Sequence, residues 1–264
     1  MLKLSHVSKT FNTGTINEKK ALVDLNLHLE PGDFVTVIGG NGAGKSTMLN
    51  AVAGVWPVDS GTISIDGVDV TGLPEHKRAA FIGRVFQDPM LGTAPNMQIE
   101  ENLALAYRRG QKRGLRWGVT RAERALYRER LATLGLGLED RMTSKVGLLS
   151  GGQRQALTLL MAALQKPKLL LLDEHTAALD PATAAKVLEL SDQIVAENNL
   201  TAMMITHNMS DAIAHGNRII MMNAGQIILD IRGEEKKHLT KEILLRKFAE
   251  VSGVQEETDS LLLS

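Results

Sequence analysis

The sequence contains no cysteine, so disulfide bonds and thiolate metal sites are excluded. Aromatic residues make up only 3% of the 264 residues. Lys plus Arg and Asp plus Glu both number 30, which leaves no formal net charge. A general nucleic-acid binder carries a marked basic excess, so no nucleic-acid partner is expected.

Long apolar runs are also missing. No stretch approaches the roughly 20 apolar residues that a membrane-spanning helix needs, and the segment Met1–His6 lacks the apolar core of a signal peptide. We therefore expect a cytosolic protein that reaches a membrane only through a partner chain. The length is sufficient for one large α/β domain.

Short apolar runs alternate with helix-forming segments, which predicts an α/β fold with a mostly parallel central sheet. Residues 12–20 are polar and predict a loop, and residues 100–134 predict a helical subdomain. Strands are expected at 2–7, 22–29, 34–38, 62–65, 68–70, 169–172, 201–206, 218–222 and 227–230. Helices are expected at 47–52, 180–198 and 239–251.

A glycine-rich segment between a predicted strand and a predicted helix matches the pattern G-x-x-x-x-G-K-[ST]. Glycines let backbone N–H groups converge on phosphate oxygens, and the helix that begins there directs its positive dipole end at the same anion. Lys45 can reach the β- and γ-phosphates, and the Ser46 hydroxyl can bind Mg²⁺. The segment therefore predicts ATP binding through Gly39, Asn41, Gly42, Ala43, Gly44, Lys45, Ser46 and Thr47.

Two acids, Asp173 and Glu174, follow the apolar run Leu169–Leu172. Ligands of open α/β sheets bind at the carboxyl ends of the strands, so both acids are expected beside the phosphate loop. Asp173 would hold Mg²⁺, and Glu174 would act as general base toward the attacking water. Taken without the loop, the pair would be interpreted as a solvated turn.

The segment Leu149–Gln153 reads Leu-Ser-Gly-Gly-Gln. Ser150 can cap a helix that runs to Leu164, with Gln153 at the capping-box position. Gly151 and Gly152 would expose the N–H groups of that helix end and so form a second anion site. Without the other motifs, a plain helix cap would be the favoured interpretation.

These motifs, in this order, resemble the ATP-binding cassette of ABC transporters. The resemblance covers the chain from Leu2 to about Leu229. It implies a phosphate-loop NTPase core with an N-terminal antiparallel β-subdomain and an inserted α-helical subdomain at about residues 98–165. Residues 1–252 would form one ABC ATPase domain, and residues 253–264 a tail.

The resemblance also implies roles for single residues. Gln87 would contact Mg²⁺ and the attacking water, and His207 would contact the γ-phosphate. Phe11 would stack on adenine. Ser150–Gln153 would face the γ-phosphate of ATP held by the other subunit, and Asp180 would lie at the dimer interface. The residues that these interpretations place in catalysis are Glu174, His207, Gln87 and Lys45, and the Mg²⁺ ligands are Ser46, Gln87 and Asp173.

Three features depart from the common pattern of the family. His175 stands where many cassettes have proline, and we interpret it as a tolerated turn residue. The helix after Gln155 lacks the arginines that are often found there. The loop 12–20 is longer than the minimal form. In addition, residues 107–130 carry nine basic side chains against two acidic ones, which fits a solvated helical face, a contact with anionic lipid or an acidic permease loop, or, less well, RNA.

A stand-alone cassette implies a homodimer, or a pair with a similar cassette, on the cytoplasmic side of the membrane with an integral permease. Overall likeness favours the bacterial importer ATPases that pair with branched-chain-amino-acid-type permeases and an extracytoplasmic solute-binding protein. The cargo would then be an amino acid, in particular an aromatic one. An exporter or lipoprotein-release ATPase is the first alternative. A soluble ABC protein that acts on ribosomes or DNA is the second, although the chain has one cassette and no long coiled-coil insertion.

Overall fold

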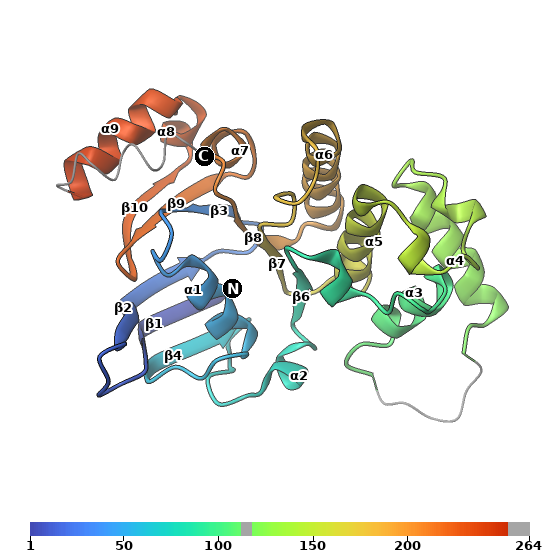
Figure 1. Ribbon diagram of the computed structural model, residues 1–264, viewed down its shortest axis with the longest axis horizontal. Coiled ribbons are helices and arrows are strands. Elements are labelled where there is room, and N and C mark those ends of the chain that lie inside the picture. Colours follow the sequence, from blue (N-terminus) through green and yellow to red (C-terminus); the bar gives the residue numbers. More distant parts are fainter. Residues whose placement is uncertain (112–117, 253–264) are drawn as a thin grey trace.

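A computed structural model describes residues 1–111 and 118–252 (Figure 1). The first of its two sheets has the strand order β2-β1-β4-β5, and all its pairs are antiparallel. Leu2 pairs with Leu29 on one side and with Ile65 on the other. This sheet is the expected N-terminal β-subdomain. Its strands are β1 (Leu2–Phe11), β2 (Lys19–Leu29), β4 (Ser60–Ile65) and β5 (Val68–Asp69).

The second sheet has the order β10-β9-β3-β8-β7-β6. Every pair in it is parallel except β9 with β10, which confirms the mostly parallel central sheet. Its strands are β3 (Phe34–Ile38), β6 (Ile82–Val85), β7 (Leu169–Asp173), β8 (Thr201–Ile205), β9 (Arg218–Asn223) and β10 (Gln226–Arg232).

Strand β7 is apolar from Leu169 to Leu172 because both faces of the sheet are covered there. Leu169 and Leu171 join a core with α1 (Lys45–Ala53) and the first sheet. Leu170 and Leu172 join a second core with α5 (Gly151–Ala163) and α6 (Pro181–Asn198). The carboxyl end of β7 is thereby fixed next to the start of α1.

The helices that flank the second core form a separate arm of the molecule (Figure 1). It contains α3 (Ile99–Tyr107) and α4 (Arg121–Ala132), which pack on α5. At the other end, α7 (Met209–Ala214) and α9 (Lys241–Ser252) enclose a third core against β9 and β10. The remaining short helices are α2 (Glu75–Arg78), α8 (Glu234–Lys237) and 3-10 turns at Pro89–Gly92, Leu138–Asp140 and Val146–Leu148.

The structure differs from the expected elements at several places, and the short helices α2, α7 and α8 were not predicted. β1 continues to Phe11 and β2 begins at Lys19, because these two residues pair and close a hairpin around the loop. β6 was not predicted, since Gly83 and Arg84 interrupt its apolar pattern. Within residues 1–111 and 118–252, no helix is long and apolar enough to cross a membrane. The expected tail, 253–264, lies outside the described residues.

Candidate nucleotide-binding site

The glycine-rich loop lies between β3 and α1 and is pressed against both sheets. Gly39 has φ +148°, and a Cβ there would lie 2.2 Å from the carbonyl oxygen of Met222 on β9. Gly44 has φ +103°, and a Cβ there would lie 2.6 Å from the carbonyl oxygen of Ala21 on β2. Only glycine satisfies both the backbone angle and the space at these two positions. The loop conformation is therefore set by packing from both sides.

Lys45, the first residue of α1, is 7% exposed. Its Nζ donates to the carbonyl oxygens of Gly39 at 2.6 Å and Gly40 at 3.1 Å, so the ammonium lies across the loop. Burial lowers the pKa of Lys45, whereas the nearby Glu174 carboxylate acts in the opposite direction. A desolvated cation at the glycine-rich loop is suited to bind phosphate oxygens.

A cavity of about 310 Å³ opens over this loop. Phe11, from the end of β1, closes one side, and its ring meets Trp56 edge-on with centroids 5.0 Å apart. The cavity therefore combines an aromatic ring, a loop of backbone N–H groups and a carboxylate. It is lined by Phe11, Lys19, Ala21, Asn41, Gly42, Ala43, Gly44, Lys45, Ser46, Thr47 and Glu174.

Asp173 ends β7 and Glu174 follows it, with φ +44°, which is unusual for a residue other than glycine. The backbone N–H of Glu174 donates to the carbonyl oxygen of Ile205 at 3.1 Å, so β8 supports this conformation. Burial raises the pKa of Asp173, and an ion pair with Arg84 at 3.2 Å opposes that shift. His207, which follows β8, has its Nδ1 3.7 Å from Oε2 of Glu174.

The predicted capping box at the start of α5 is confirmed. The Ser150 hydroxyl accepts from the Gln153 N–H, and the Gln153 side chain accepts from the Ser150 N–H, both at 3.2 Å. A Cβ at Gly152 would lie 2.2 Å from Cγ2 of Thr183, in the first turn of α6. Asp180 caps α6 through the Thr183 N–H at 3.1 Å, as its position before Pro181 predicts.

Some of the predicted site residues lie outside the cavity. Gln87 is exposed in the loop after β6, and Ser150 and Asp180 are exposed at two helix starts. The cavity of one chain is thus lined by the glycine-rich loop, Phe11 and Glu174. The predicted residues that do not line it are Gly39, Gln87, Ser150, Gly151, Gly152, Gln153, Asp173, Asp180 and His207.

His175 is the turn residue that was expected, although its burial was not predicted. The residue is in a turn, but it is only 2% exposed, and its Nε2 lies 2.9 Å from the Ser191 hydroxyl on α6. Burial lowers the pKa of His175 to about 4, and the nearby His215 adds to that shift. This contact with Ser191 therefore holds the chain immediately after Glu174 against α6. No local pattern predicts this contact, because Ser191 lies sixteen positions further along the chain.

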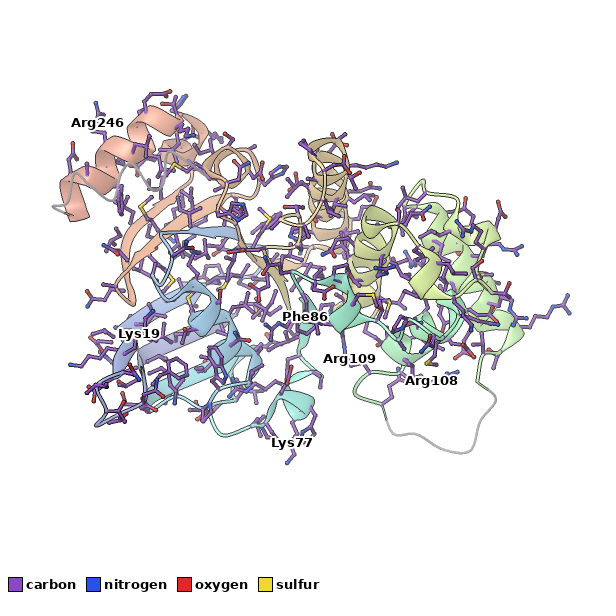
Figure 2. All side chains as sticks on the ribbon, in the orientation of Figure 1. Lys19, Lys77, Phe86, Arg108, Arg109 and Arg246 are labelled. Carbon is purple, nitrogen blue, oxygen red and sulfur yellow. The ribbon has the colours of Figure 1, made fainter. Side chains whose placement is uncertain are left out.

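Two residues near the site were missed. Lys19 lines the cavity, and its Nζ would lie 3.1 Å from a Cβ at Gly42; Figure 2 labels this side chain. It was assigned to the loop, where a lysine carries no distinct signal. Arg84 contacts Asp173. The available signal for Arg84 was a charged residue inside an apolar stretch, because a buried charge requires a partner.

Part of the basic stretch, residues 107–130, makes ion pairs and hydrogen bonds within the protein. Arg108 pairs with Glu123 at 2.7 Å, and Arg124 binds both carboxylate oxygens of Glu100 at 2.6 and 2.7 Å. Arg109 donates to the carbonyl oxygen of Ala162 at 3.0 Å. These three arginines stabilise the helical arm. Arg121, Arg128 and Arg130 are exposed, whereas Lys112, Arg113 and Arg116 lie outside the described residues.

Comparison with known proteins agrees with this geometry. Residues 22–177 match the ABC transporter family. The chain is 44% identical over 252 residues to a tyrosine transport ATP-binding protein of Clostridioides difficile (strain R20291), covering 94% of this chain and 98% of that protein. It is 34% identical to the spermidine/putrescine import ATP-binding protein PotA of Haemophilus ducreyi (strain 35000HP / ATCC 700724), covering 94% of this chain but 62% of that longer protein.

Solved structures give the same result. A dimeric ATP-binding cassette in a post-hydrolysis state, bound to ADP and Pi, superimposes with a TM-score of 0.74 at 32% identity, covering 88% of this chain and 98% of that one. The ADP conformation of another ABC transporter cassette gives a TM-score of 0.77 at 25% identity, covering 97% and 99%. The chain belongs to the ABC transporter family, and it is an ATP-binding cassette ATPase.

Proposed function

We propose that the chain hydrolyses MgATP at a dimer interface and thereby powers uptake of a small solute through a membrane permease. The observation that carries this proposal is the single cavity lined by Phe11, the glycine-rich loop and Glu174. Phe11 stacks on adenine, the loop and Lys45 bind the phosphates, and Glu174 polarises the attacking water. Gln87 and His207 contact the water and the γ-phosphate.

A magnesium ion fits the side chains around the loop. The Ser46 hydroxyl, the Asp173 carboxylate and the Gln87 amide offer the oxygen atoms that this cation prefers. Asp173 is buried enough that its pKa is raised, so a nearby cation would stabilise its charged form. When bound, the ion would neutralise charge on the β- and γ-phosphate oxygens. The side chains of Ser46, Asp173 and Gln87 would hold and orient the ion.

The separation between the cavity and the segment Ser150–Gln153 supports a two-fold dimer. Ser150–Gln153 do not line the cavity of their own chain, and Ser150 lies exposed at the start of α5. In a head-to-tail pair, this helix start faces the γ-phosphate of the partner's ATP, and one symmetric interface makes two equal sites. The relative bound to ADP and Pi is itself described as dimeric.

A groove of about 460 Å³ between the loop after β6 and α3 supports a contact with the permease. Leu91 is 71% exposed and Leu105 is 42% exposed on its edge, which is unusual for large apolar side chains. Figure 2 labels Phe86 and Arg109, which line it. A short apolar segment of the permease that carries an acidic side chain would match this lining.

The relatives support import and suggest the cargo. The tyrosine transport ATP-binding protein matches the chain over nearly its whole length, which favours an amino acid, in particular an aromatic one. The proposal includes an extracytoplasmic solute-binding protein and a position on the cytoplasmic side of the membrane. We also assign residues 1–252 to one ABC ATPase domain, with a helical subdomain at about 98–165 and a tail at 253–264.

Reconstitution tests this proposal directly. The chain is combined in proteoliposomes with the permease and solute-binding protein encoded beside it, and uptake of radiolabelled tyrosine, tryptophan and leucine is measured with internal ATP. We expect ATP-dependent accumulation of an aromatic amino acid and none with the Lys45→Ala chain. ATP-dependent movement of the solute out of the compartment that contains ATP would overturn the import assignment, and preferential leucine uptake would overturn the aromatic cargo.

A further inference from the structure

Arg84 is the only charged residue of β6, and its side chain is 13% exposed. One nitrogen, Nη2, donates to Oδ1 of Asn50 at 2.8 Å and to Oδ2 of Asp173 at 3.2 Å. The guanidinium carbon lies 4.6 Å from the ring centroid of Phe86. Three separate elements, α1, β7 and the loop after β6, therefore meet at one guanidinium group.

The two hydrogen-bond acceptors of Arg84 belong to the elements that supply the proposed Mg²⁺ ligands. Asn50 is four residues after Ser46 on α1, so both side chains lie on the same face of that helix. Asp173 is itself a proposed ligand at the end of β7. Gln87, the third proposed ligand, follows Arg84 by three residues, with the stacked Phe86 between them.

We propose that Arg84 is a positioning residue that holds the Mg²⁺ ligands of α1 and β7 at fixed positions relative to each other. This inference rests on the proposed function. Arg84 binds Oδ2 of Asp173, and the acceptor sites of Oδ1 are left for the metal or its water. Hydrogen bonds of this kind orient a carboxylate toward a metal and commonly change its affinity about 10- to 100-fold.

Two simpler roles make different predictions. If Arg84 only neutralised a buried carboxylate, lysine would serve equally well, since it supplies the same charge. If Arg84 mainly repelled the metal, its removal would tighten Mg²⁺ binding. Neither role explains why Nη2 also binds Asn50 while Nε of Arg84 lies buried with no hydrogen-bond partner among the described residues. A buried N–H without a partner is costly, which indicates that the bridge between α1 and β7 determines this placement.

The test measures binding of a non-hydrolysable ATP analogue in excess Mg²⁺ and in EDTA. For both Arg84→Met and Arg84→Lys we expect the dissociation constant in Mg²⁺ to rise about tenfold. The constant in EDTA should change less than twofold. Arg128→Met, at an exposed position on α4, is the control, and it should match the wild-type chain in both conditions.

Asn50→Ala keeps the buried charge pair and cuts only the link to α1. It should produce a smaller rise in the same direction, and no further rise when combined with Arg84→Met, because both changes break one bridge. Melting temperatures identify any variant that fails to fold. Unchanged or tighter binding in Mg²⁺ for Arg84→Met, or wild-type behaviour of Arg84→Lys, would overturn the inference. Normal nucleotide binding by Lys45→Ala would instead overturn the proposed function.

Discussion

Nδ1 of His207 lies 3.7 Å from Oε2 of Glu174. The two residues follow neighbouring parallel strands, since Asp173 on β7 pairs with Ile205 on β8. The carboxyl ends of these strands thus deliver a proposed base and a proposed γ-phosphate contact to one point beside the glycine-rich loop. The strained backbone of Glu174, at φ +44°, turns the chain sharply at this point.

Glu174→Gln should separate ATP binding from hydrolysis. The amide has the same shape but cannot accept a proton from the attacking water, so we expect turnover to fall about 100-fold or more. ATP affinity should stay within about threefold of wild type, because the loop and Lys45 are intact. Glu189→Gln, at an exposed position on α6, is the control. Near-normal turnover in Glu174→Gln would show that Glu174 is not the base.

Lys45→Ala should weaken nucleotide binding sharply. The change removes a buried cation that we place on the phosphates, and a hydrogen bond to a charged group contributes about 1.5–3 kcal/mol. Such a loss corresponds to a drop in affinity of about 10- to 150-fold, measurable by titration calorimetry. Lys77→Ala, an exposed lysine on α2 that is labelled in Figure 2, should bind as the wild-type chain does. Unchanged affinity in Lys45→Ala would show that the glycine-rich loop does not bind the nucleotide.

His175 should make the folded chain sensitive to mild acid. Its pKa is about 4 in the folded state against 6.5 for an ordinary histidine, so the unfolded chain takes up a proton first as the pH falls below 6.5. The stability that neutral burial provides above pH 6.5 is therefore lost progressively toward pH 4. His175→Gln, which keeps a hydrogen-bonding group of similar length, should lose less stability between pH 7 and pH 5, by about 2 kcal/mol.

Urea unfolding at pH 7 and at pH 5 measures the stability that His175→Gln and the wild-type chain each lose between these pH values. His215→Gln provides a control of opposite sign, because the Asp192 hydrogen bond at 2.6 Å raises the pKa of His215. The stability from that pair is present below pH 6.5 and is lost as the pH rises through the raised pKa. Identical pH slopes for His175→Gln and wild type would contradict the buried, neutral state of His175.

Local patterns predicted those parts of the fold and site that neighbouring residues determine. The apolar run of β7, the glycine-rich loop and the caps at Ser150 and Asp180 each depend on a few consecutive residues. β6 was not predicted because its residues are determined by contacts with parts of the chain that are distant in sequence. A Cβ at Gly83 would lie 2.4 Å from the Ala162 carbonyl oxygen, and Arg84 pairs with an acid 89 positions away.

Ser150→Arg should block ATP-driven dimerisation while leaving ATP binding by the single chain largely intact. A large cation would fill the space that the helix start offers to the partner's γ-phosphate, although the cavity of the same chain does not include Ser150. Sedimentation of Glu174→Gln with and without ATP gives the reference, and Ser150→Arg in that background should stay monomeric. Thr133→Arg, at an exposed position after α4, should still dimerise.

Mixing Ser150→Arg with Lys45→Ala tests whether each site is shared between chains. Either variant by itself should be nearly inactive, because every shared site that two identical chains could form carries one defect. A mixed two-fold dimer places both defects in one site and leaves the other intact. Random mixing at equal amounts makes half the dimers mixed, so independent sites would restore about a quarter of wild-type turnover. If Glu174→Gln remains monomeric at saturating ATP, the isolated dimer is contradicted, and the two subunits would need the permease to hold them together.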